Sequence, residues 1–95
     1  MKLMTPRLFE GNEITEIDLR LDGLTGKQLM HVERQVRAEL REQGEMPIML
    51  ESESAYLIAV AAAAAGQPIE LFEQLSGADF TAVKMTVQNF LLGSA

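Results

Sequence analysis

The sequence predicts an α+β domain that is mostly helical, in which an N-terminal β-hairpin packs on a small bundle of three main helices plus one short helix. Three observations lead to this fold class. Apolar and polar residues alternate near the N-terminus, a long middle segment repeats its apolar residues at helical spacing, and an alanine-rich run is apolar on every side. The length of 95 residues suits a single domain over residues 1–95.

The hairpin is expected over residues 1–22, where two arms flank a turn. Gly11-Asn12 separates the arms and suits a tight turn. Pro6 lacks a backbone N–H, so the first arm is predicted to be an edge strand. The second arm alternates apolar with charged side chains, as a half-buried strand does. This alternation predicts that Ile17, Leu19 and Leu21 lie on one face of the strand.

A long helix is predicted over residues 25–43. Thr25, with Gln28 three residues later, has the pattern of a capping box, and Gly44 suits the left-handed residue that ends a helix. Glu33 and Arg37 are spaced for a favourable ion pair one turn apart. Apolar residues recur at helical spacing and predict one buried stripe made of Leu29, Val32, Val36 and Leu40.

The next helix is predicted over residues 52–65. Its apolar run from Ala55 to Ala65 would reach roughly 17 Å, too short for the roughly 30 Å of a bilayer's hydrocarbon. A helix that is apolar all round and does not span a membrane must be buried in protein. We therefore expect a central core helix that is capped by Ser52 and ends at Gly66.

The second half of this helix is almost entirely alanine. Small side chains let a neighbouring helix approach closely, so a tight crossing is predicted there. Ala62→Leu or Ala63→Leu is expected to overpack the crossing and to cost about 1–3 kcal/mol of stability.

Two further helices complete the predicted fold, a short one over residues 69–75 and a last one over residues 77–92. Ser76 and Asp79 have the spacing of a second capping box. One side of the last helix is expected to be buried through Phe80, Val83, Val87, Phe90 and Leu91.

The composition argues against several classes of function. The net charge is −6, so a nucleic-acid backbone would repel the chain unless its basic groups cluster. The chain has no cysteine and therefore no disulfide, thiol nucleophile or thiolate metal site. No apolar stretch of signal-peptide length follows the N-terminus, and cytosolic residence is expected.

Residues with catalytic chemistry are few. His31, the one histidine, points away from the buried stripe and is expected to face water. Glu51 and Glu53 could act as an acid–base pair, but favourable charges near a helix N-terminus explain them more simply. Neither a metal-ligand spacing nor a glycine-rich phosphate loop is present. We predict a protein that is not an enzyme and uses no cofactor, metal or small-molecule substrate.

The clearest candidate for binding is a basic strip on the long helix. The chain is acidic overall, yet half of its eight basic residues are predicted to fall on one helical face, namely Lys27, Arg34, Arg37 and Arg41. Met30 projects from the middle of this face. This strip is either a solvated face balanced by Glu33, the interpretation we favour slightly, or a docking surface for a partner.

Other candidates are exposed methionines and a leucine. Six methionines are many for this length, and methionine is frequent on surfaces that accept variable partners. Met46 and Met49 lie in the connector between the first two helices and are expected to be exposed. Met85 and Leu92 are stacked on one side of the last helix, either as core residues against the hairpin, which we favour, or as an exposed apolar pair.

The order of these features resembles that of a known family, the tail assembly chaperones of contractile-tailed, Mu-like bacteriophages and prophages. A short strand pair is followed by "LDGLTGKQLMHVER", "AYLIAVAAAAAGQPIELFEQL" and "DFTAVKMTVQNFLLG". The resemblance runs from about Leu8 to Gly93 and is most specific at residues 24–26, 56–68 and 89–91.

The resemblance implies a non-catalytic protein of the host bacterial cytoplasm that binds the tape-measure protein during tail assembly and is absent from the mature virion. The tail tube protein is a second candidate partner, weak self-association is compatible with the role, and no nucleic acid or membrane is implied. Together, the candidate partner-binding residues are Lys27, Met30, Arg34, Arg37, Arg41, Met46, Met49, Met85 and Leu92.

An alternative is a small helical DNA-binding or protein-binding regulator of a phage or mobile element. The consecutive helices from Ile69 to Leu92 could mimic a helix-turn-helix. Lys84 is the one basic residue in that span, which argues against phosphate contact.

Overall fold

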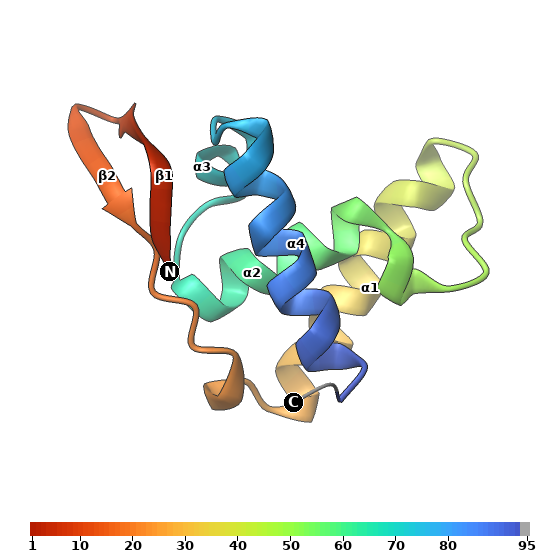
Figure 1. Ribbon diagram of the computed structural model, residues 1–95. Coiled ribbons are helices and arrows are strands. Elements are labelled where there is room, and N and C mark those ends of the chain that lie inside the picture. The colour runs from red at the N-terminus through yellow and green to blue at the C-terminus, as the bar shows by residue number, and fades with distance from the viewer. Residues whose placement is uncertain (94–95) are drawn as a thin grey trace.

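The computed structural model describes residues 1–93 and has the α+β, mostly helical architecture that the sequence predicts. Two antiparallel strands precede four α-helices (Figure 1). Two short 3₁₀ turns lie at residues 21–23 and 50–52. The bounds of the elements are β1 (Lys2–Phe9), β2 (Asn12–Glu16), α1 (Gly26–Glu42), α2 (Ser54–Ala65), α3 (Ile69–Glu73) and α4 (Gly77–Leu91).

The hairpin turn lies one residue earlier than predicted. Phe9 pairs with Asn12, so the two-residue turn is Glu10-Gly11 rather than Gly11-Asn12. Both turn residues have positive φ, 51° and 82°, as the favoured hairpin turns require. The ladder is irregular between Lys2 and Arg7, the stretch that contains the proline.

The second strand is also shorter than predicted. It ends at Glu16, and the segment that follows is not a strand although Ile17 and Leu21 are buried. The N–H of Arg20 donates to the carbonyl of Ala64 at 3.4 Å, which ties this segment to the end of α2. Ile17 still continues the hairpin pairing, because its N–H donates to the carbonyl of Met1 at 2.8 Å and its carbonyl accepts from the Met1 amino group at 2.7 Å. Beyond Ile17, the alternation reports burial against α2 and not pairing in the sheet.

Local capping signals in α1 are confirmed. The Thr25 hydroxyl accepts from the N–H of Gln28 at 3.3 Å, and the Gln28 side chain accepts from the N–H of Thr25 at 2.8 Å. Gly44 follows the helix with a φ of 79°. The predicted stripe faces the core, with three residues buried and Leu29 partly buried.

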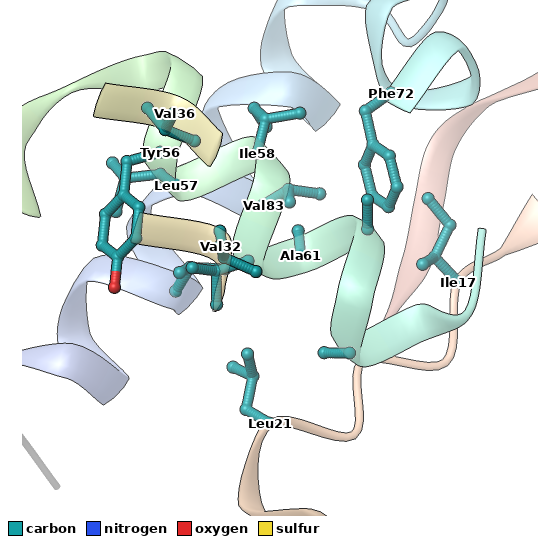
Figure 2. Close-up of a cluster of buried hydrophobic side chains, with 14 of the residues drawn as sticks. Ile17, Leu21, Val32, Val36, Tyr56, Leu57, Ile58, Ala61, Phe72 and Val83 are labelled. Carbon is teal, nitrogen blue, oxygen red and sulfur yellow. The ribbon is translucent and has the colours of Figure 1, made fainter. Parts of the chain in front are cut away.

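The helix α2 is the central element of the core, as predicted. It runs between α1 and α4 (Figure 1) and contacts both of them as well as α3. Figure 2 shows side chains of these neighbours gathered around it, among them Val32, Phe72 and Val83. Gly66 ends the helix with a φ of 65°, as expected.

Two expectations about α2 are wrong. Ser52 does not cap it, because residues 50–52 form a 3₁₀ turn that buries Leu50, and α2 begins after Glu53 with no side-chain cap. Ala63 is exposed, whereas Ala61 and Ala62 are buried. The tight crossing therefore involves one side of the alanine run and leaves the opposite side open.

The last two helices pack less uniformly than predicted. The helix α3 is a single short helix that ends at Glu73, two residues before the predicted end, and buries Leu71 and Phe72. In α4, Val83 and Val87 are fully buried, but Phe90 is 36 % exposed and lies outside the core. The face of α4 that is buried against its neighbours is therefore narrower than the apolar pattern of its sequence predicts.

The carboxylate of Asp79 joins α4 to the hairpin. Ser76 caps α4 by accepting from the N–H of Asp79 at 3.2 Å, but the second half of the predicted capping box is absent. The Asp79 carboxylate accepts from the Ser76 hydroxyl at 3.1 Å and from the N–H groups of Met4 at 2.8 Å and Thr5 at 3.0 Å. These donors, first Met4 and then Thr5, lower the pKa of Asp79 because they stabilise its charged form.

Candidate functional site

The basic strip lies on the solvent side of α1. Burial of Val32, Val36 and Leu40 fixes the rotation of the helix and turns the opposite face outward. The strip comprises five residues, all of them exposed, namely Lys27, Met30, Arg34, Arg37 and Arg41. The structure thus brings these predicted candidates together on a single accessible surface.

The cations of the strip form no ion pair with any described residue. Among the side chains that the structure describes, the one ion pair joins Arg20 Nε to Asp18 Oδ2 at 2.7 Å, outside the strip. The predicted pair between Glu33 and Arg37 does not form. A one-sided positive surface remains on a protein whose net charge is −6, and it can attract an acidic partner.

An exposed apolar segment adjoins the C-terminal end of the strip. Met46 is 87 % exposed and Met49 is also exposed, as predicted, and Ile48 between them is fully exposed at 101 %. Arg37 and Arg41 line a hollow of about 80 Å³ together with Met46. We call residues 46–49 the apolar connector. Sequence reasoning missed Ile48, since no helical or strand period applies to a connector.

The positions of Met85 and Leu92 correct our favoured expectation. These side chains are 58 % and 59 % exposed, so they are the exposed apolar pair and do not pack against the hairpin. Their helix packs chiefly against α2 and also contacts β1. They therefore lie on a different element from the strip and the apolar connector, and the structure does not gather all the candidates into one site.

A groove runs along the seam between α1 and α2 and was not foreseen from the sequence. Its floor is a line of small residues on the open side of α2, Ala55, Ala59 and Ala63. Val32 of α1 and Ile69 at the start of α3 line its sides. It consists of three neighbouring open hollows of about 350, 430 and 220 Å³. We call this feature the alanine groove.

Chemical groups suited to catalysis are sparse in the described part of the chain. His31 is exposed, as predicted, and lines the alanine groove. Glu53 is partly buried directly before α2, and the side chain of Glu51 lies outside the described residues. With the side chain of Glu51 left aside, no group of three or more acidic or histidine side chains in the described part of the chain is placed to hold a metal ion. No described helix is long and apolar enough to cross a membrane.

A comparison with protein families decides the assignment. The family model described as "Phage tail assembly chaperone proteins, E, or 41 or 14" matches residues 1–92. The chain belongs to this phage tail assembly chaperone family. No curated protein and no solved structure matches the chain significantly. The resemblance seen in the sequence is therefore confirmed at the level of the family.

The surface of this chaperone also bears on the alternative of a DNA-binding regulator. Lys84, the basic residue of α4, is already engaged by other groups. Its ammonium donates to the Ser54 hydroxyl at 3.1 Å and lies 5.4 Å from the centre of the Phe80 ring. A phosphate contact by Lys84 would have to break both interactions, so nothing in α3 and α4 favours this alternative.

Proposed function

We propose that this tail assembly chaperone binds the tape-measure protein in the host bacterial cytoplasm while the tail is built, acts without catalysis, and is absent from the mature virion. A tape-measure protein carries long apolar helical seams that are exposed until the tube encloses them. A chaperone for such a protein needs an accessible surface with modest affinity, so that it can bind in several copies and later leave.

The observation that carries the proposal is the unpaired basic strip with the apolar connector at its end. Arg37 and Arg41 border Met46, so charge and exposed apolar surface are contiguous. Acidic residues that flank an apolar seam of the partner would match this surface in charge and in polarity. Long-range attraction would speed association and set the register, while contacts with methionine would slow release.

Reversing the charge of two residues in the strip tests the proposal. The double variant Arg34→Glu and Arg37→Glu is expected to fold normally, because both side chains are exposed and form no ion pair among the described residues. Binding to the tape-measure protein should fall by about tenfold or more at low salt, and by less at high salt where screening already weakens the attraction. The measurement is a pull-down from co-expressing cells at two ionic strengths.

A charge-matched control separates the strip from net charge. Lys2→Glu with Arg20→Glu makes the same change in net charge on exposed residues outside the strip. This control should retain the tape-measure protein nearly as well as the wild type. Equal binding by the strip variant and the wild type would exclude the strip from the mechanism and leave the apolar connector and the Met85–Leu92 pair as candidates.

Met30→Ala probes the apolar contact inside the strip. The side chain is 52 % exposed, so its removal should leave the fold unchanged. Binding should weaken by roughly threefold to tenfold, the range typical for truncating a contributing interface residue. The loss should be nearly the same at low and high salt, because the side chain carries no charge. A loss that disappears at high salt would contradict an apolar contact at this position.

A further inference from the structure

The alanine groove has a shape suited to binding a helix. Its floor residues Ala55, Ala59 and Ala63 are spaced four residues apart, so they form one line along α2. From the first to the last, this line is roughly 12 Å long, which is about two turns of helix. Because these three residues carry only methyl side chains, the larger apolar side chains of an incoming helix can enter the groove along this line, and Ile58 of α2 adds apolar surface at the Ala55 end.

The two ends of the groove differ in charge. Lys27 and His31 share a hollow with Ala63 at one end. Glu39 and Glu73 share a hollow with Ala55 at the other end. Along α1 the wall of the groove therefore changes from basic to acidic. No ion pair among the described residues neutralises Lys27, Glu39 or Glu73.

This charge difference selects one direction for an occupant. A helix carries partial positive charge at its N-terminus and partial negative charge at its C-terminus. Its N-terminal end is favoured beside Glu39 and Glu73, and its C-terminal end beside Lys27. Since α1 runs from Lys27 towards Glu39, the favoured occupant is antiparallel to α1. Carboxylates in its C-terminal half would also face Lys27, the one residue of the basic strip that lines the groove.

We propose that the alanine groove receives one helical segment of the tape-measure protein, with its apolar face inward and its chain direction antiparallel to α1. The inference rests on the proposed function and extends it to a second surface, a groove that supplies the apolar contact next to the basic strip. The matching segment has large apolar residues at helical spacing, acidic residues in its C-terminal half and basic residues towards its N-terminus.

Blocking the groove is the first test. Ala63 is exposed and arginine is a good helix former, so Ala63→Arg should fold normally and fill the groove with a charged side chain. The amount of co-expressed tape-measure protein retained should fall by about tenfold. The matched control is Ala82→Arg, which places the same side chain at an exposed alanine of α4 and should retain the partner like the wild type.

Photo-crosslinking tests the direction. A crosslinking residue is placed at His31, near the basic end, or at Ala55, near the acidic end, and both positions are exposed. The crosslinked positions on the tape-measure protein are then mapped by mass spectrometry. Position 31 should reach a residue C-terminal to the one reached from position 55. The reverse order would overturn the antiparallel direction, and no crosslink from either position would overturn the groove.

The outcomes separate this inference from the function on which it rests. If the wild type retains the tape-measure protein and Ala63→Arg retains it equally well, the groove is excluded while the proposed function stands. If Ala63→Arg loses the partner and Ala82→Arg does not, the groove is supported whatever the basic strip contributes. If the wild type fails to retain the tape-measure protein at all, the proposed function and the groove fall together.

Discussion

Asp79→Asn is expected to release the hairpin from α4 and to lower the stability of the whole chain. The carboxylate is 2 % exposed and accepts two backbone N–H groups from β1, one on each oxygen. An asparagine amide has one accepting oxygen and one donating nitrogen, so its NH₂ group would face a backbone donor. A buried donor without an acceptor costs free energy, and detachment of β1 is the simplest way to avoid that cost.

Hydrogen exchange provides the direct measurement. In the wild type, the amides of Met4 and Thr5 should be protected, because they are donors to Asp79. In Asp79→Asn they should exchange much faster, and the thermal unfolding temperature should fall. Asp18→Asn is the matched control, since Asp18 is exposed and pairs with Arg20 at the surface. Unchanged protection at Met4 and Thr5 in Asp79→Asn would show that the carboxylate does not hold the hairpin.

The same interaction predicts a dependence of stability on pH. The pKa of Asp79 is lowered in the folded chain from its ordinary value of 3.8. A lowered carboxyl pKa means that the unfolded chain binds the proton more readily, so the stabilisation is complete above the ordinary value and is lost as the pH falls through the folded value. The difference in stability between wild type and Asp79→Asn should therefore be largest near neutral pH and shrink in strong acid.

A graded series along the alanine run should show where α2 is crossed. Ala61 is fully buried in the same core cluster as Val83 of α4 (Figure 2), so Ala61→Leu is expected to cost about 1–3 kcal/mol through overpacking. Ala62 is buried but also lines the alanine groove, so part of a leucine there could enter open space. Ala62→Leu should cost less than Ala61→Leu. Ala63→Leu should be nearly neutral, because Ala63 is exposed.

Chemical denaturation of the three variants checks this order, with Ala63→Leu as the internal control for the change in side chain. A large loss of stability in Ala63→Leu would show that the open side of α2 is packed and that the alanine groove is not accessible. Under the further inference, Ala63→Leu should keep its stability and still weaken binding of the tape-measure protein, since the added side chain occupies the groove.

The features that sequence alone determined are those in which the interacting residues are near neighbours along the chain. The capping box of Thr25 and Gln28 and the helix ends at Gly44 and Gly66 depend on a few adjacent residues, and all are as predicted. The basic strip belongs to the same class. It lies on one helix, so the helical period and the buried stripe on the opposite face were enough to place it in solvent.

Local patterns failed where a distant segment competed for the same group. Asp79 has the spacing of a capping box, but its carboxylate accepts from residues of β1 more than seventy positions away in the sequence. Leu21 continues the alternation of a strand, yet it lies beyond the hairpin pairing, which ends at Ile17 opposite Met1, and it belongs to the core around α2. A sequence period reports that a residue is buried and does not report which element buries it.

Tertiary structure alone decided the alanine groove, because the groove has no counterpart in any single segment. Its floor comes from α2, one wall from α1 and another from α3, and its charged ends combine residues from α1 and α3. The alanine run predicted close packing on every side. In the structure α1 and α4 cover only part of α2, and a helix of small side chains leaves a hollow wherever no neighbour covers it.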